Sequence, residues 1–519
     1  MKNLLLLPLL CLGYLFAPAQ PLLERILSNE IKFAISDGVQ FDDGNWMFSA
    51  FAYSVTPGDS AMAIVLKTDS TLTPLWAKRY KYLRRDDFSS ITRLHDGNVL
   101  VGGTMRQTFS LQDGASVYKL DTAGNVIWHL MYEEDFDDRI LDIFEQKDSS
   151  LMVFVREGVT NQPINIIHAT PTGSILSERT YTWNSTFGVG ANTVVADSNE
   201  RYYYSGQVFT GGLSEVHVCA VDQTNQFWYK RYVLGGRTTG CFVSAYMHAD
   251  STILLSGTVA DSVGIFVNIW LMKIDLQGNV IWAKEYGRDL NFQENPSQII
   301  PLPNGEMMMF GRVFDEDGSQ GFAMRLDAQG NVQWIKGYNP TSPTFGIGDV
   351  FPLSDGRYLL SGNSGTEAYM MLTAADGEGV CFQNELAINQ ADISVEDSTY
   401  AVAVGGTGVL VFNPPLTQYD ISIEDSLLCA GSVGIPELVR ERLEVYPNPA
   451  SEVLHIQLPS GIGTVKQFSV VDTWGRTITV PMVRKGDILT VSLLNLPAAF
   501  YWVLIQTDEK RYVERFVKK

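Results

Sequence analysis

A stretch of fourteen residues occurs three times in this chain with few changes. It reads KLDTAGNVIWHLMY at 119–132, KIDLQGNVIWAKEY at 273–286 and RLDAQGNVQWIKGY at 325–338. The seven slots of its tryptophan are occupied by Trp76, Trp128, Ser177, Trp228, Trp282, Trp334 and Phe382. A second marker, typified by HDGNVLVGG from His95, recurs with the same period as the first. Two markers with a shared period of about 50 residues indicate a repeat array such as a propeller or solenoid.

Each repeat reads as four short strands joined by tight turns. The D-G-N and G-N pairs are hairpin signals, because Gly and Asn accept positive φ at little cost. On the fourth strand, period-2 alternation places Val280, Trp282, Lys284 and Tyr286 on one face, where they can wedge against the neighbouring unit. Seven such units without a helical pattern between them predict an all-β fold, a seven-bladed β-propeller over residues 20–382. The fourteen residues are thus interpreted as architecture rather than as a cofactor box.

Two points of this architecture stay open. LLERIL at 22–27 and GVCF at 379–382 both fit the outer strand that would close the seventh unit. Residues 383–433 contain an echo, DISVEDS at 392–398 and DISIEDS at 420–426, whose alternating Ile and Val suggest strands. This small β extension either packs on the propeller or forms a module of its own.

The repeat region resembles secreted bacterial propellers with quinoprotein-like or delta-60-type repeats. Its D-x-x-G-x-x-x-W element is similar to the tryptophan-docking repeat of quinoproteins, with a turn one residue shorter. Those enzymes often carry a haem-attachment CxxCH, which this chain lacks, and no quinone or other cofactor is predicted. Such a resemblance implies a fold rather than a function, because propellers host binding and catalysis alike.

The end of the chain has a different character. Residues 434–444 are interpreted as a linker, and VYPNPASEVLHIQLP follows at 445–459. From residue 445 to 519 the chain resembles the type A C-terminal sorting domain of the type IX secretion system of Bacteroidota. The matching motif residues are Tyr446, Pro447, Asn448 and Pro449 near its start and Lys518 and Lys519 at its end. The resemblance implies an Ig-like β-sandwich, the type IX machinery as partner, and cargo that is released or held at the cell surface.

The N-terminus carries the marks of an export signal. Lys2 precedes an apolar run from Leu4 to Phe16, and Ala17-Pro18-Ala19 is a small-x-small cleavage site that predicts a signal peptide of residues 1–19 and cleavage between Ala19 and Gln20. The run is shorter than the roughly 20 apolar residues that a membrane span requires, and no later run is longer. The mature chain is therefore expected without a transmembrane segment, secreted or at the outer surface after passage through the periplasm.

Charge and cysteine usage narrow the partners further. The chain has 38 basic and 58 acidic side chains, a formal net charge of −20, which argues against nucleic acid as a partner. Export permits disulfides, and Cys219–Cys241 and Cys381–Cys429 are the simplest pairing of the four mature cysteines. Four buried free thiols are the alternative.

No catalytic or metal-binding motif was found. The six histidines have no metal-ligand spacing, and neither HExxH nor GxSxG occurs. The acidic stretch DEDGS at 315–319 begins like a calcium loop, but Leu326 stands where a bidentate Glu is required. No catalytic, cofactor-binding or metal-binding residue is therefore assigned.

The functional expectation rests on one rim of the propeller. The first-to-second and third-to-fourth connections are short and repetitive, whereas the connections at the opposite rim vary, and recognition tends to lie on variable loops. Five aromatic residues are the candidate binding rim: Phe136, Trp183, Phe187, Phe292 and Phe345. Binding of an extracellular glycan or protein, in adhesion or as a scaffold, is preferred to enzymatic activity. The alternative is a polysaccharide hydrolase or lyase that uses rim carboxylates such as Asp86, Asp87, Asp135 or Asp137.

Overall fold

The chain folds into two compact units built from β-strands. One unit spans Pro21–Gly431 and the other contains Ser432–Lys519. The structure, a computed structural model, describes residues 20–519 apart from short stretches. The stretches left out are 29–31, 54–60, 82–85, 107–112, 134–137, 159–162, 183–188, 211–212, 223, 238, 240–243, 249, 261–266, 288–292, 303, 316–317, 340–344, 365–366, 380–382, 401–402, 406–409, 414–415, 434–442, 459–464, 473–476, 479, 495, 498 and 508–510.

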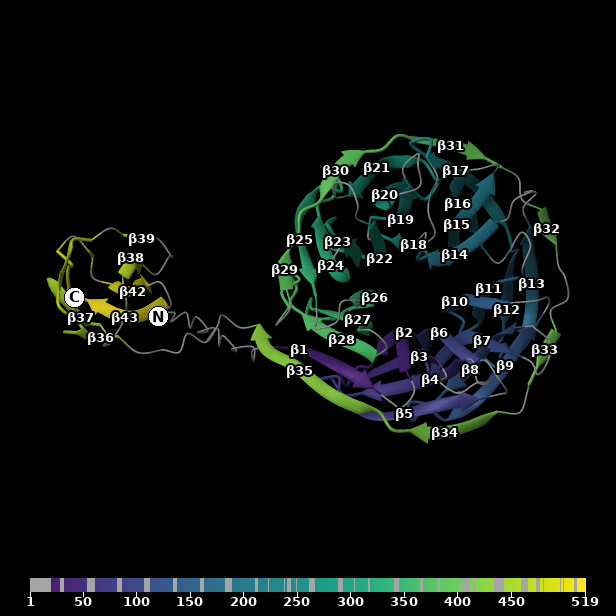
Figure 1. The fold of residues 1–519 in the computed structure, drawn as a ribbon, viewed down its shortest axis with the longest axis horizontal. Coiled ribbons are helices and arrows are strands. Elements are labelled where there is room, and N and C mark those ends of the chain that lie inside the picture. The colour runs from purple at the N-terminus through teal and green to yellow at the C-terminus, as the bar shows by residue number, and fades with distance from the viewer. Residues whose placement is uncertain are drawn as a thin grey trace, which may run out of the picture. The chain divides into compact units, whose positions relative to one another are not determined.

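The larger unit consists of seven antiparallel blades that form a ring (Figure 1). Blade 1 contains β2 (Lys32–Gln40), β3 (Trp46–Tyr53), β4 (Ala61–Thr68) and β5 (Pro74–Lys81). Blade 2 contains β6 (Asp86–Arg93), β7 (Val99–Arg106), β8 (Asp113–Leu120) and β9 (Val126–Glu133). Blade 3 contains β10 (Arg139–Glu145), β11 (Leu151–Arg156), β12 (Ile164–Ala169) and β13 (Ile175–Thr182). Blade 4 contains β14 (Val189–Ala196), β15 (Tyr202–Thr210), β16 (Leu213–Val221) and β17 (Gln226–Leu234).

The next two blades are joined by one parallel bridge between Val267 and Gln293. Blade 5 contains β18 (Ser244–Met247), β19 (Thr252–Ala260), β20 (Val267–Asp275) and β21 (Val280–Gly287). Blade 6 contains β22 (Gln293–Pro301), β23 (Met307–Asp315), β24 (Gly318–Leu326) and β25 (Val332–Tyr338). In these six blades the strands follow chain order from the centre of the ring outwards. The predicted seven-bladed β-propeller is confirmed.

Blade 7 is closed by the N-terminal strand. It contains β26 (Phe345–Pro352), β27 (Tyr358–Ser364) and β28 (Glu367–Thr373), and β1 (Gln20–Ser28) pairs with β28 as its fourth strand. Leu23 lies opposite Leu372 and Leu27 opposite Ala368. Of the two sequences that fit this place, the structure uses LLERIL, so the two ends of the repeat region meet in one blade.

Residues 383–433, which we call the belt, run around the outside of the propeller (Figure 1). Its strands pair in turn with the outer strands of blades 6, 5, 4, 3, 2, 1 and 7. They are β29 (Gln383–Glu385), β30 (Asn389–Asp392), β31 (Val395–Thr399), β32 (Ala403–Gly405), β33 (Leu410–Phe412), β34 (Thr417–Ile421) and β35 (Glu424–Val433). The belt therefore packs on the propeller and gives every blade a fifth strand.

The two echo sequences of the belt cross blade junctions. Ile393, in the first echo, is buried in the core between blades 4 and 5, and Ile421, in the second, packs against the core between blades 7 and 1. Asp392 pairs with Lys284 of blade 5 at 2.6 Å, and Asp397 with Lys230 of blade 4 at 3.1 Å. An apolar residue that fills the junction, flanked by carboxylates that reach strand-four cations, thus explains why the echo recurs.

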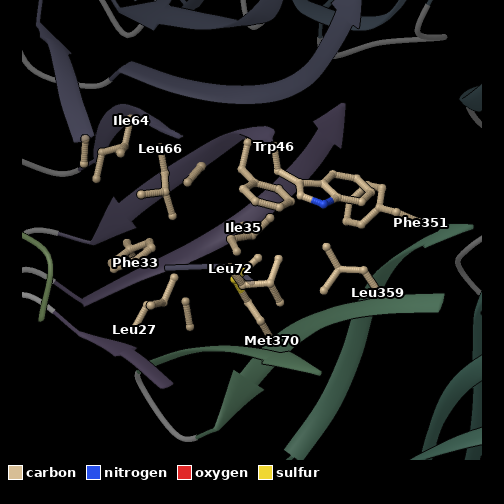
Figure 2. Packing of buried hydrophobic residues seen from close by; sticks show 14 of the residues in the cluster. Leu27, Phe33, Ile35, Trp46, Ile64, Leu66, Leu72, Phe351, Leu359 and Met370 are labelled. Atoms are coloured by element: carbon tan, nitrogen blue, oxygen red, sulfur yellow. The ribbon is translucent and has the colours of Figure 1, made fainter. Parts of the chain in front are cut away.

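The hydrophobic core of the propeller lies between neighbouring blades. Figure 2 shows the cluster at the closure, where Phe33, Ile35 and Trp46 of blade 1 face Leu359 and Met370 of blade 7. The indole of Trp46 stacks on Phe48 with ring centroids 5.6 Å apart. Because each cluster draws on two blades, no blade has a core of its own, as is typical of repeat proteins.

The repeated fourteen residues fasten one blade to the next at five of the seven junctions. The hydroxyl of Tyr286 in blade 5 donates a hydrogen bond of 2.6 Å to the carbonyl oxygen of Gly330, in the turn of blade 6. Trp282 lies against the same glycine, whose φ is +78° and whose added Cβ would lie 3.0 Å from the indole. Equivalent bonds join Tyr80 to Gly124, Tyr132 to Gly173, Tyr232 to Gly278 and Tyr338 to Gly377. The predicted wedge of aromatic side chains against the neighbouring unit is thus observed.

The C-terminal unit contains two four-stranded sheets. One has the order β36 (Glu444–Tyr446), β37 (Val453–Gln457), β41 (Ile488–Ser492), β40 (Met482–Lys485). The other has the order β39 (Thr477–Ile478), β38 (Val465–Asp472), β42 (Ala499–Thr507), β43 (Arg511–Lys518). Leu454 and Ile456 of the first sheet share a buried core with Val503 and Phe516 of the second. This is the expected β-sandwich.

Candidate functional site

A ring of polar residues lies on the innermost strands, one residue from each blade. Its members occupy the same position, six residues before the Asp or Asn of the first tight turn. They are Asp37, Ser90, Asp142, Thr193, Ser244, Gln298 and Asp349, and we call them the axial ring. A β-bulge or register shift accompanies the ring residue in six blades, all except blade 5.

Three of the ring side chains, those of Asp37, Asp142 and Gln298, accept hydrogen bonds from backbone N–H groups. Oδ2 of Asp37 accepts a hydrogen bond of 2.9 Å from the N–H of Ile91 in blade 2, and Oδ1 accepts one of 2.7 Å from Gly38. Oε1 of Gln298 accepts a hydrogen bond of 2.5 Å from Val350 in blade 7. The ring thus satisfies buried donors and joins one blade to the next.

The three carboxyl groups of the ring titrate above their ordinary range. Burial raises the pKa of Asp37 to about 6, although the N–H groups of Ile91 and Gly38 lower it. Burial, reinforced by the charge of Asp37, raises the pKa of Asp142 to about 7, against one N–H bond from Ile143. The same two causes hold the pKa of Asp349 well above its usual value. Ionisation of one carboxyl therefore opposes ionisation of the others.

A carboxyl group with a pKa near neutrality can act as a general acid or base. In Asp37, however, both oxygens accept backbone hydrogen bonds, and Oδ1 of Asp142 accepts one of 2.8 Å from Ile143. These contacts give Asp37 and Asp142 a structural role on the innermost strands. Sequence reasoning missed the ring, although its constant offset from the first turn was a signal that could have revealed it.

The predicted binding rim lies largely outside the described residues. Phe136, Trp183, Phe187 and Phe292 fall in stretches that the structure leaves out. Phe345 begins β26, and only its backbone is described. The binding role of these five residues stays a prediction.

The rim carboxylates of the hydrolase alternative are only partly described. Asp86 is buried at the start of β6. Asp87 accepts hydrogen bonds from both the N–H and the hydroxyl of Thr104, the former at 3.2 Å. Asp135 and Asp137 fall outside the described residues. Asp87 is thus engaged with its own blade.

The predicted sorting motif joins the two ends of the C-terminal unit. Oδ1 of Asn448 accepts a hydrogen bond of 2.9 Å from the N–H of Val517, and Ala450 forms a parallel bridge with Lys518. The N–H of Lys519 donates a 2.8 Å bond to the carbonyl oxygen of Ala450. Pro447 and Pro449 both follow cis peptide bonds, after Tyr446 and Asn448. The structure thus brings the Tyr446–Pro449 motif and the terminal lysines together.

One of the predicted disulfides is not formed. Cys219 is a free, fully buried thiol on β16, and burial raises its pKa to about 12, although a hydrogen bond with Tyr204 lowers it. Cys241 and Cys381 lie outside the described residues, and only the backbone of Cys429 is described. Cys381–Cys429 stays a prediction, as does cleavage between Ala19 and Gln20, where Gln20 is the first described residue.

Within the described part of the chain, no three His, Cys, Asp or Glu side chains converge in a way that could hold a metal ion. No helix long and apolar enough to span a membrane occurs among the same residues.

Comparison with known proteins identifies the C-terminal unit. Residues 444–519 match the family described as the secretion system C-terminal sorting domain. This confirms the resemblance of the tail to a type IX sorting domain. A search of curated proteins found no match.

Several solved structures are similar to this chain. PorZ, a surface component of the type IX secretion system of Porphyromonas gingivalis, is 10% identical, with 93% of this chain and 81% of PorZ covered and a TM-score of 0.34. A protein of unknown function from Dyadobacter fermentans is 11% identical, with 67% of this chain and 97% of that protein covered and a TM-score of 0.39. The β-propeller domain of the Trilobed protease from Pyrococcus furiosus is 10% identical, with 69% of this chain and 96% of that domain covered and a TM-score of 0.39.

Proposed function

We propose that this chain, whose sorting domain directs export to the cell surface or the medium, is a β-propeller that binds an extracellular glycan or protein. Binding would take place at the rim that carries the second-to-third and fourth-to-first strand connections. Strand alternation within each blade puts these connections on the same side of the ring.

The observation that carries the proposal is the difference between the two rims. At one rim every first-to-second connection is a tight turn, as where the N–H of Gly97 bonds to the carbonyl oxygen of Leu94 at 3.0 Å. Aspartates cap these turns, for instance Asp96, whose Oδ1 accepts the N–H of Asn98. The opposite rim carries sequences as different as TWNSTFGVGAN at 182–192 and NPTSPTFGIGD at 339–349. Varied loops on a rigid scaffold are typical of recognition surfaces.

Hydrolysis is the second candidate, and the axial ring is the observation that favours it. The pKa of Asp142 is raised, in part by the charge of Asp37. Glycosidases likewise use a carboxylic acid with a raised pKa beside an ionised carboxylate. Their backbone hydrogen bonds favour a structural role instead. Binding is therefore the preferred function.

The test is retention of the purified full chain on immobilised polysaccharides and matrix proteins, with soluble products measured in the same tubes. We expect retention without products. Trp183→Ala and Phe187→Ala should weaken retention, whereas Phe227→Ala, which removes an exposed aromatic ring from the outer strand β17, should not. Products that accumulate with time would establish the hydrolase, and equal retention of all three variants would place the ligand elsewhere.

A further inference from the structure

The belt is uncharged along one part of its course. No Asp, Glu, Lys or Arg occurs from Thr399 to Tyr419, whereas the echoes on either side, at 392–398 and 420–426, are both acidic. Within this uncharged run, β32 pairs with the outer strand of blade 3 and β33 with the outer strand of blade 2 (Figure 1). We call β32 and β33 together the neutral sector of the belt.

The neutral sector presents apolar side chains to solvent. Val404 in β32 is 49% exposed and Val411 in β33 is 42% exposed. The same uncharged run holds two exposed aromatic rings, those of Tyr400 and Tyr419. In the first echo, by contrast, Ile393 is only 9% exposed because it fills the junction between blades 4 and 5. The two valines of the neutral sector therefore contribute little to fastening the belt.

The neutral sector also lies at the outer edge of two sheets. Among the strands that the structure describes, β32 pairs only with β13, and β33 pairs only with β9. Proteins usually protect such edges with charged side chains or proline, and neither β32 nor β33 contains either. Both strands are only three residues long, so they suit a side-by-side apolar contact rather than a long ladder of backbone hydrogen bonds. An exposed apolar edge without charge is typical of a contact surface.

We propose that the neutral sector is the contact surface between two copies of this chain related by a two-fold axis, a role that goes beyond ligand binding at the variable rim. Each copy has a net charge of −20, so like charges oppose the approach of two copies over most of their surfaces. The belt runs along the convex outside of the ring (Figure 1), and two convex walls touch over a short arc. An arc centred on the neutral sector leaves the acidic echoes outside the contact. A basic partner would favour the echoes instead, whereas a two-fold axis lets uncharged, apolar residues meet their own copies.

The experiment is sedimentation equilibrium of the purified full chain and of Val404→Asp over a range of concentrations. We expect the parent chain to form dimers and Val404→Asp to dimerise at least about tenfold more weakly, because two carboxylates would face each other across the axis. The parent dimer should become tighter as salt is added, since screening weakens the repulsion between chains of like charge. Thermal unfolding of Val404→Asp should match that of the parent because Val404 is exposed, which separates lost association from lost folding.

Leu427→Asp is the matched control. Leu427 is 52% exposed on the belt strand β35, which pairs with blade 7 outside the neutral sector, and the change adds the same charge. Dimerisation of Leu427→Asp should equal that of the parent chain. A parent chain that stays monomeric at every concentration would overturn the inference, and so would equal dimerisation of the parent and Val404→Asp. An equal loss of dimers in both variants would also overturn it, because the effect would then not be specific to the neutral sector.

Discussion

At the scale of single residues, the carboxyl groups of the axial ring make the stability of the propeller depend on pH. The pKa of Asp142 is about 7 in the folded chain, above the value of about 3.9 expected in the unfolded chain. The folded state therefore binds this proton more tightly than the unfolded state. The stability that the protonated Asp142 carboxyl contributes is fully present below about pH 4 and is lost as the pH rises towards 7.

Asp142→Asn should therefore stabilise the propeller above neutrality. Asn keeps an oxygen that can accept the N–H of Ile143 and carries no charge at any pH. Because the side chain is only partly buried, we expect the free energy of unfolding to rise by about 2 kcal/mol at pH 8, which is less than the full free-energy equivalent of the pKa shift. Denaturant unfolding at pH 8 and at pH 4 measures this, and the gain should shrink at the lower pH. An equal effect at both values would show that ionisation of Asp142 does not matter.

At the scale of elements, the fourth strand of one blade and the turn of the next form the unit that repeats. Tyr286 on β21 is the clearest example, since its hydroxyl is fully buried and donates to the Gly330 carbonyl oxygen at 2.6 Å. Tyr286→Phe keeps the ring and leaves this carbonyl without its donor. The free energy of unfolding should fall by about 1–2 kcal/mol.

Tyr419→Phe is the comparison for this prediction. Tyr419 lies exposed on the belt strand β34, and its ring contacts Arg79, a contact that Phe can retain. Chemical denaturation of the two variants should therefore separate them clearly. Similar losses in both would indicate that the hydrogen bond to the glycine turn contributes little.

At the scale of the whole molecule, the closure between blades 7 and 1 is made differently from the five junctions that have a Tyr–Gly hydrogen bond. β1 has Leu23 and Leu27 where β5 has Trp76 and Tyr80, so the aromatic contacts to the next turn are absent there. Arg25 replaces them, because its Nε donates to the carbonyl oxygen of Thr71 at 3.0 Å and its Nη2 to Oγ1 of Thr73 at 3.1 Å. Arg25 also pairs with Asp425 of the belt. One side chain thus holds blade 7, blade 1 and the belt.

Arg25→Gln should loosen this closure and lower the free energy of unfolding by about 2–3 kcal/mol, because several charge-assisted hydrogen bonds are lost and Asp425 keeps an unpaired charge. Proteolysis should also become faster near the N-terminus and in the belt. Thermal unfolding and mass spectrometry of the fragments measure both effects. Arg93→Gln breaks the exposed ion pair between Arg93 and Asp42, whose atoms lie 2.6 Å apart. It should change neither the unfolding free energy nor the rate of proteolysis. Unchanged unfolding of Arg25→Gln would mean that the β1–β28 pairing closes the ring unaided.

The sequence by itself determined the features that depend on neighbours in the chain. The turn residues of DGNV and the alternation around Trp282 are local signals, and their period was enough to predict seven four-stranded blades. The Tyr446–Pro449 motif likewise identified the sorting domain. Turn chemistry and strand alternation act within a few residues, so they can be read without knowledge of the fold.

The tertiary structure alone decided which distant residues meet. LLERIL and GVCF both have the pattern of an outer strand, and only pairing with β28 selects the first. The belt finds its partners at strand edges that exist only once the ring has formed, and the three carboxyl groups of the axial ring meet because blades 1, 3 and 7 face one axis. Burial and pairing of this kind depend on residues far apart in the sequence, so they are properties of the assembled blades.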